Sequence, residues 1–277
     1  MTMPGKLSLV LPAHNEVQNL EAVVRRAFEV LPELTEDFEV IVVDDGSRDG
    51  TSELADRLAA ESPKVRVVHH PVNRGYGAAL TSGFQAATGD YIMFMDADQQ
   101  FDPADLAQLT PFVPQADIVA GYRIKRRDPW IRLLYARIFN LCMRLLFGLN
   151  VRDIDCAFKV YRADLLKSIE ITTAGALINT ELLVKARRAG ATIIEVGVRH
   201  FPRPTGESSG GSPRVILRAM RETIWLWWHM LGYQPPAVPT RGRPTPASLF
   251  LVRAVALATI GIGALAAASA WLLRRRG

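Results

Sequence analysis

The first half of the chain alternates short apolar runs with amphipathic segments, and this alternation constrains the fold more than any other feature. The segments between the apolar runs have the periodicity of helices. Apolar strands joined by helices indicate a mostly parallel sheet covered on both faces, which binds ligands at the carboxyl ends of its strands. We expect strands at 7–11, 40–43, 65–69, 91–95 and 118–121, the first ended by Pro12, and helices at 17–31, 51–61, 77–87 and 103–112.

Two carboxylates and an amide follow the expected strand 91–95. Asp96, Asp98 and Gln100 alternate along the chain, and an extended segment would turn these three side chains to one side. Hard cations such as Mg²⁺ or Mn²⁺ bind one or two carboxylates and leave other positions to water and phosphate. A solvated acidic turn would explain an isolated Asp-x-Asp, but the position at a strand end favours a metal and diphosphate site.

Polar residues also follow other expected strands. Residues 12–16 form a turn after the first strand, and Asp45 follows the second, where it could accept hydrogen bonds from a nucleobase or a ribose. After the third strand, Arg74 could pair with phosphate, and Gly75 would let the backbone approach a ligand. This loop lacks the Walker lysine and the G-x-G-x-x-G spacing, so a P-loop or a dinucleotide site is disfavoured.

Basic residues are concentrated towards the C-terminal end. Residues 199–277 carry eleven Arg, no Lys and two Glu. Arginine-rich segments bind nucleic acid or anionic lipid, but here the arginines neighbour tryptophans and a long apolar run, which favours a membrane and no nucleic acid. Residues 214–232 are predicted to form an amphipathic helix at the membrane interface, although an ordinary docking helix with tryptophans in the core is the alternative.

Residues 254–273 contain no charge, and twenty residues suffice for a helix to cross a bilayer. We predict a transmembrane helix at 248–273, a Pro-rich linker at 234–247 and a basic tail at 274–277. A helix in the interface, or one packed on a partner helix, is the alternative. Arginines flank the span on both sides and do not orient it. We place the protein at the cell membrane, single-pass or interfacial, with a cytoplasmic catalytic domain.

The motifs together resemble those of family 2 glycosyltransferases. That family has a Pro-x-x-Asn-Glu strand end, an Asp-Asp-Gly-Ser-x-Asp-Gly-Thr turn, an Asn-x-Gly loop and an Asp-x-Asp metal motif, and all four occur here in order. The resemblance covers residues 6–230 and implies a GT-A nucleotide-sugar-binding domain over 1–233. It implies a metal site for Mg²⁺ or Mn²⁺ formed by Asp96, Asp98 and Gln100, and a donor site formed by Pro12, Asn15, Glu16, Asp45, Arg74, Gly75 and Asp96.

The resemblance is closer to polyprenyl-phosphate hexose synthases of the dolichol-phosphate mannose synthase type. Their Gly-x-Arg is similar to residues 121–123, their Asp-x-x-x-Phe-Lys-x-x-Arg block to the segment ending at Arg162, and their Arg-x-x-Gly-x-Ser loop to residues 203–208. This implies inverting transfer of a hexose from GDP-mannose or a UDP-hexose to a polyprenyl phosphate. Arg123, Arg132 and Arg203 would hold the acceptor phosphate, and Asp96, Asp98, Arg123 and Arg203 would be catalytic.

Polyprenyl phosphate is already an anionic nucleophile, so this reaction requires no general base. A family relative acting on another lipid, on protein or on polysaccharide would need one, such as Asp155 or Glu181. Glu181 could instead contact sugar hydroxyls or merely begin a helix, and Lys159 and Ser208 are further candidates. A non-catalytic scaffold that binds nucleotide sugar is the third alternative.

Overall fold

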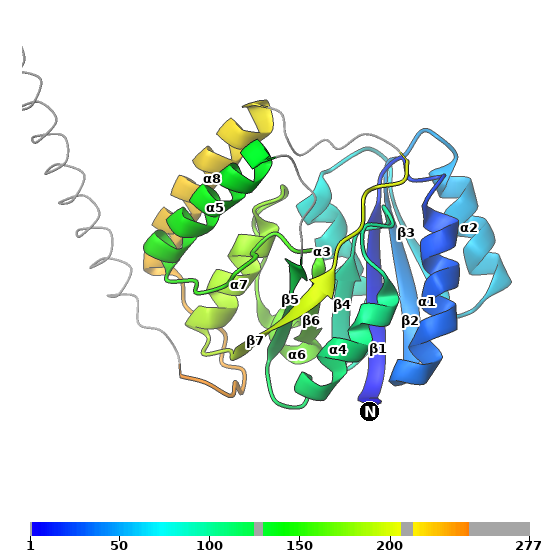
Figure 1. Ribbon diagram of the computed structural model, residues 1–277, viewed down its shortest axis with the longest axis horizontal. Coiled ribbons are helices and arrows are strands. Elements are labelled where there is room, and N and C mark those ends of the chain that lie inside the picture. The colour runs from blue at the N-terminus through cyan, green and yellow to red at the C-terminus, as the bar shows by residue number, and fades with distance from the viewer. Residues whose placement is uncertain (1, 125–129, 206–212, 244–277) are drawn as a thin grey trace, which may run out of the picture.

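The computed structural model describes residues 2–124, 130–205 and 213–243. The described residues form a seven-stranded sheet with helices packed around it (Figure 1). The strands are β1 (Met3–Ala13), β2 (Thr35–Asp45), β3 (Val65–His70), β4 (Tyr91–Met95), β5 (Ile118–Ile124), β6 (Phe158–Arg162) and β7 (Ile193–Arg199). The main helices are α1 (Leu20–Leu34), α2 (Thr51–Glu61), α3 (Tyr76–Ala86), α5 (Trp130–Phe147), α6 (Ala163–Ser168), α7 (Ile178–Arg188) and α8 (Pro213–Gly232).

The strand order in the sheet is β3-β2-β1-β4-β6-β5-β7. Only β6 runs antiparallel to its neighbours among the described strands, so the prediction of a mostly parallel sheet is confirmed. The chain builds outwards from β1 to β3 and then returns, so that β4 pairs with the other side of β1. Such a reversal leaves a crevice at the carboxyl ends of the two central strands.

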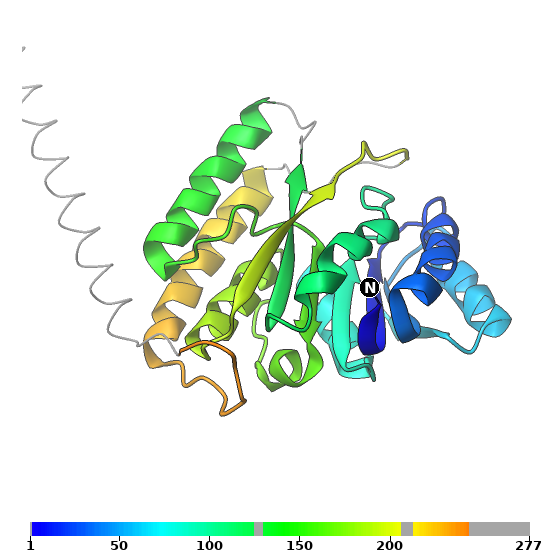
Figure 2. The same ribbon diagram turned by 60° about the horizontal axis from the view of Figure 1, so that its bottom comes forward.

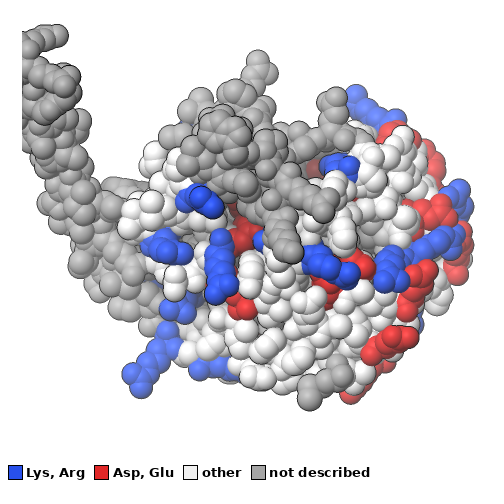
Figure 3. Space-filling view, viewed as in Figure 1, with Lys and Arg blue, Asp and Glu red and all other residues white. Residues whose placement is uncertain are grey.

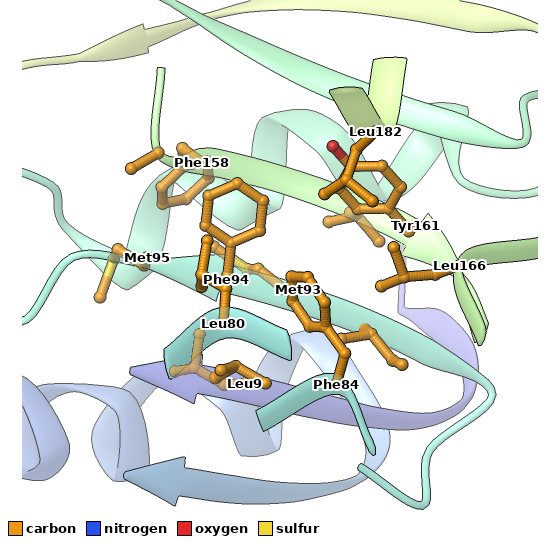
Figure 4. Packing of buried hydrophobic residues seen from close by; sticks show 14 of the residues in the cluster. Leu9, Leu80, Phe84, Met93, Phe94, Met95, Phe158, Tyr161, Leu166 and Leu182 are labelled. Atoms are coloured by element: carbon orange, nitrogen blue, oxygen red, sulfur yellow. The ribbon is translucent and has the colours of Figure 1, made fainter. Parts of the chain in front are cut away.

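The core lies between the central strands and the helices that cover them. Leu80 and Phe84 of α3 pack towards Leu9 of β1 and Phe94 of β4 (Figure 4). Phe94 also stacks near Tyr161 of β6, with ring centroids 6.2 Å apart. Because β1 and β4 are covered on both faces, their sequences are almost continuously apolar. This packing fixes the strand ends from which the polar loops project.

Several predicted boundaries differ from the structure: α1 is Leu20–Leu34 rather than 17–31, β2 is Thr35–Asp45 rather than 40–43, and β5 continues to Ile124 rather than ending at 121. β1 continues through Pro12 to Ala13, because β4 stops pairing with β1 at Val10 and the missing N–H of Pro12 therefore breaks no bond on that side. The predicted helix 103–112 is three short pieces: η1 (Pro103–Asp105), α4 (Leu106–Leu109) and η2 (Thr110–Phe112). Pro111 lies in the last piece and lacks the N–H that a regular helix would use.

The helices α5 and α8 lie side by side at one end of the molecule in both views (Figures 1 and 2). Among the described residues, no helix is long and apolar enough to cross a membrane. The predicted span 248–273 and the tail 274–277 lie outside the described residues. Part of the predicted linker is docked on the domain: the Arg241 N–H donates to Asp117 Oδ2 at 3.0 Å, and the Gly242 N–H donates to the Gly190 carbonyl at 2.9 Å.

A buried carboxylate ties the amino ends of the central strands together. Glu39 Oε1 accepts hydrogen bonds of 2.7 Å from Ser8 Oγ and from the backbone N–H and hydroxyl of Thr88. Burial alone would raise the pKa of Glu39, but these hydrogen bonds lower it from 4.5 to about 2. The ionised group therefore stabilises the fold above pH 4.5, and the stabilisation is lost as the pH falls towards 2.

Glu39→Gln is expected to lower the free energy of unfolding at pH 7 by about 2 kcal/mol, because buried donors lose an ionised acceptor. The variant should also lose less stability than the parent between pH 4.5 and pH 2. Urea unfolding at pH 7 and at pH 3 measures both effects. Equal stability of the two proteins at pH 7 would contradict this role for Glu39.

Candidate active site

Asp96 and Asp98 follow β4 directly, at the carboxyl end of the sheet. The Tyr76 hydroxyl donates a hydrogen bond of 2.9 Å to Asp96 Oδ1, and the Gln100 N–H donates one of 3.0 Å to Asp98 Oδ1. Burial and the charge of Asp98 raise the pKa of Asp96 to about 7, and burial also raises the pKa of Asp98. Two desolvated carboxylates that repel each other in this way are stabilised by a bound cation.

The donor set fits a hard divalent cation. No group of three or more His, Cys, Asp or Glu side chains that could hold a metal occurs among the described residues. Two carboxylates are nevertheless sufficient for Mg²⁺ or Mn²⁺, because these ions keep several waters and accept substrate phosphate as a further ligand. The adjacent Asp96 and Asp98 are therefore compatible with the predicted metal.

The segment 96–100 is not extended, and that prediction is wrong. Gln99 has a left-handed backbone, with φ of 61°, which breaks the alternation of side chains. Gln100 pairs instead with the segment after β7: the Phe201 N–H donates to the Gln100 carbonyl at 2.9 Å, and Gln100 Nε2 donates to the Phe201 carbonyl at 3.2 Å. The Oε1 atom is the part of the Gln100 side chain suited to a cation.

Arg203 lies between two acidic side chains of the site. Its guanidinium forms an ion pair with Glu16, and its Nη1 is 3.6 Å from Asp98 Oδ2. Nε donates to the Thr205 carbonyl at 2.8 Å, which holds the side chain in place. The structure therefore brings together Glu16, Asp98 and Arg203, although Glu16 and Arg203 are separated by 187 positions in the sequence.

Asn19 connects the same loops and was not singled out from the sequence. Its Oδ1 accepts hydrogen bonds from Gln99 Nε2 at 2.9 Å and from the Thr205 hydroxyl at 2.7 Å, and its Nδ2 donates to Glu16 Oε2 at 2.7 Å. Its place three residues after Glu16, at the start of α1, is the only sequence signal for it. Tyr76 was also missed, although it directly follows the candidate Gly75.

Asp45 organises the loop after β3. Its Oδ1 accepts hydrogen bonds from His70 Nδ1 at 2.6 Å and from the Arg74 N–H at 2.9 Å, and its Oδ2 accepts the Gly75 N–H at 2.8 Å. These bonds bring the backbone of Arg74 and Gly75 to the end of β2. They also occupy much of the acceptor capacity that we expected a nucleobase or a ribose to use.

The turn after β1 borders this loop. Pro12 is buried within β1, whereas Asn15 is exposed and has a left-handed φ of 58°. Asn15 Oδ1 accepts the Arg48 N–H at 2.9 Å, and the Asn15 N–H donates to Ser47 Oγ at 2.9 Å. These two bonds join the turn after β1 to the turn after β2. Arg74, in the loop after β3, is exposed and is a cation of the candidate donor site.

The three candidate acceptor arginines differ. Arg123 forms a two-pronged ion pair with Asp153, with nitrogen–oxygen distances of 2.6 and 2.7 Å, so its guanidinium is already engaged. Arg132 belongs to α5, but its side chain lies outside the described residues, as does Ser208. Arg203 is the described arginine that faces the Asp98 carboxylate.

Lys159 and Glu181 are buried rather than open to a substrate. Lys159 Nζ donates to the Ile154 carbonyl at 2.9 Å and to the Cys156 carbonyl, and its burial lowers its pKa. Glu181 lies in the first turn of α7 and has no exposed surface. Asp155 is exposed, and its charge acts on the pKa of Tyr76.

The α/β fold, with its mostly parallel mixed sheet, is a GT-A-like fold. It is similar to glucosyl-3-phosphoglycerate synthase from Mycobacterium tuberculosis, solved in complex with Mn²⁺, UDP and phosphoglyceric acid. The TM-score is 0.65 at 21% sequence identity, and the similarity covers 86% of this chain and 80% of that one. Similarity at this identity establishes the fold.

The chain belongs to glycosyl transferase family 2, whose family model matches residues 8–170. It is 34% identical to the undecaprenyl-phosphate mannosyltransferase of Micrococcus luteus, over 73% of this chain and 87% of that protein. It is 32% identical to the polyprenol monophosphomannose synthase of Mycolicibacterium smegmatis, over 77% and 85%. It is also 32% identical to glycosyltransferase AglD of Haloferax volcanii, over 93% of this chain, but it spans only 42% of that protein.

Proposed function

We propose that the protein transfers a hexosyl group from a GDP- or UDP-linked sugar to a polyprenyl phosphate at a membrane. The observation that carries this proposal is the Asp96–Asp98 carboxylate pair at the end of β4, with Arg203 facing it 3.6 Å from Asp98. The pair provides negative charge for a cation and diphosphate, and the arginine provides positive charge for a second anion. Relatives named for transfer to undecaprenyl phosphate support the acceptor class.

The donor would lie across the ends of β1, β2 and β4. Backbone groups after β1, near Asn15 and Glu16, and the loop held by Asp45 form one wall, and Arg74 supplies a cation beside it. Asp96, Asp98 and Gln100 would hold Mg²⁺ or Mn²⁺. The bound cation would act as a Lewis acid that stabilises the diphosphate leaving group.

Acceptor activation requires no base in this proposal. Glu181 could not act as one, because it is fully buried and its oxygens accept hydrogen bonds from Thr172 and Thr173. A polyprenyl phosphate is ionised at neutral pH, so its oxygen can attack the anomeric carbon directly. Arg203 would orient that phosphate through two N–H groups.

A panel of radiolabelled nucleotide sugars tests the proposal. Membranes containing the full chain are incubated with each donor, Mg²⁺ or Mn²⁺ and a short polyprenyl phosphate, and the lipid is then extracted into organic solvent. We expect label in the organic phase for at least one GDP- or UDP-linked hexose. Label that stays aqueous for every donor would contradict the proposal, and tight nucleotide binding without transfer would favour a scaffold.

An exposed apolar surface on α5 and α8 supports membrane contact. Residues three or four apart on a helix share a face, and both helices present such a set. α5 contains no acidic residue and α8 contains only Glu222, whereas many acidic side chains in Figure 3 gather over α1 and α2. This combination suits an anionic lipid surface. The large apolar residues that are exposed are Ile138, Leu141 and Leu145 of α5, and Ile224, Trp225 and Trp228 of α8.

Trp228→Glu is expected to slow transfer to polyprenyl phosphate embedded in phosphatidylglycerol vesicles by roughly tenfold, because an exposed indole is replaced by a charge that anionic lipid repels. Transfer to a short acceptor in detergent should not change. Ala60→Glu, which adds the same charge to an exposed site on α2, is the matched control. Equal losses on both acceptors would argue against contact between α8 and lipid.

A further inference from the structure

We propose that Glu181 is a positioning residue for the donor site: it holds residues 172–174 against the start of α3 and thereby fixes Tyr76 beside Asp96. The inference rests on the proposed function, because it assigns Asp96 to the donor and metal site. Glu181 would thus act on the donor site through its hydrogen bonds, although its carboxylate takes no direct part in the reaction.

Glu181 is bonded entirely within the protein. Its Oε2 accepts hydrogen bonds from the Thr173 N–H at 2.8 Å and the Thr173 hydroxyl at 2.6 Å. Its Oε1 accepts the Thr172 N–H at 2.9 Å and the Thr172 hydroxyl, and it pairs with Lys185 Nζ at 2.6 Å. Burial opposes ionisation, but Lys185 and the two threonines lower the pKa of Glu181, so the carboxylate is charged at neutral pH. One side chain therefore fixes two consecutive residues of an otherwise irregular loop.

The loop that Glu181 holds is in close contact with the start of α3. The Gly77 N–H donates to the Ala174 carbonyl at 2.9 Å. A Cβ atom on Gly77 would lie 2.5 Å from the Thr173 carbonyl oxygen, and one on Gly75 would lie 2.7 Å from the Ala174 carbonyl oxygen. Neither distance is possible for a side chain, so both glycines are required by this contact. The backbones of the loop and of α3 cannot move independently.

Tyr76 lies between these two glycines, and its hydroxyl donates to Asp96 Oδ1 at 2.9 Å. On the other side, the Gly75 N–H is bound by Asp45 Oδ2 at 2.8 Å. The start of α3 is thus held by Asp45 and by the loop that Glu181 fixes. A shift of that loop would displace the Tyr76 hydroxyl and change the orientation of Asp96.

The test is a double-mutant cycle on the full chain in membranes, with Glu181→Gln, Tyr76→Phe and the double variant. Each single change should raise the donor KM roughly tenfold and leave the KM for a short polyprenyl phosphate unchanged. Because both changes would act through the same contact with Asp96, the double variant should also be impaired only about tenfold. Independent effects, which would multiply to about a hundredfold, would overturn the proposal, as would an unchanged donor KM in Glu181→Gln.

Glu39→Gln is the matched control, since it changes another buried, hydrogen-bonded glutamate at the opposite end of the sheet. It should lower thermal stability without changing the donor KM. If Glu181→Gln does not fold, Thr173→Ala removes only the hydroxyl bond of 2.6 Å to Glu181 Oε2, and it should give a smaller rise in donor KM with the same lack of additivity with Tyr76→Phe. Wild-type protein that transfers no sugar would refute the proposed function, whereas an active wild type with additive variants would refute only the role of Glu181.

Discussion

Asp98→Ala is expected to abolish sugar transfer and to leave the protein folded. The change leaves Asp96 as the only carboxylate of the pair, so the charge of the departing diphosphate is no longer offset. Losing preorganised electrostatic stabilisation of this kind lowers kcat by roughly 10³-fold. Little stability should be lost, because Asp98 and Asp96 repel each other in the free protein and burial raises the pKa of Asp98. Label extraction measures transfer, and thermal unfolding measures the fold.

Asp102→Ala provides the control for this experiment. Asp102 is an acidic residue of the same loop, but it accepts the Ala104 N–H at 3.0 Å and pairs with Arg26 rather than facing the site. Its loss should lower stability by about 1 kcal/mol, as for other helix caps, and leave turnover unchanged. Full turnover of Asp98→Ala in excess Mg²⁺ or Mn²⁺ would refute the assignment of Asp98 to the metal.

The strands that frame the site could be predicted because each buried strand is a short apolar run. β4 matches its predicted range 91–95, and Asp96 therefore follows the strand as expected. β6 and β7 were not predicted. The residues of β6 include the buried Lys159, whose charge breaks the apolar run, and most of β7 is only partly buried. Periodicity does not reveal a strand whose interior holds a charged group satisfied by tertiary contacts.

The types of residue in the site could be predicted, but not their pairing. The family resemblance implied that Arg123 binds phosphate, yet Arg123 is paired with Asp153, a partner thirty residues away that is brought close only by the fold. Likewise, the left-handed backbone at Gln99 turns Gln100 towards Phe201, which no local pattern indicates. Long-range contacts of this kind decide which of several similar side chains stays open to a ligand.

Arg203→Ala is expected to lower kcat/KM for polyprenyl phosphate by roughly 10²- to 10³-fold, equivalent to about 3–4 kcal/mol of transition-state stabilisation. Arg203 differs from Arg123 because its guanidinium does not form a bidentate pair with one carboxylate. One of its terminal nitrogens pairs with Glu16, and the other lies 3.6 Å from Asp98 Oδ2. If Asp98 binds a cation, that contact weakens, and Nη1 becomes available to a second anion. The donor KM should therefore change less than the acceptor KM, and steady-state kinetics with each substrate varied separately will measure the difference.

Two further variants separate phosphate binding from charge and from loop structure. Arg203→Lys keeps the positive charge but loses the planar fork, so it should recover only part of the lost kcat/KM. Arg199→Ala removes an arginine four residues upstream that pairs with Asp102 and Asp105, and it should leave the acceptor KM unchanged. Acceptor kinetics that are normal in Arg203→Ala and impaired in Arg123→Ala would assign the phosphate to Arg123, which would then have to release Asp153. The bidentate ion pair makes that release costly, since the buried Asp153 would lose both charge-assisted hydrogen bonds from Arg123.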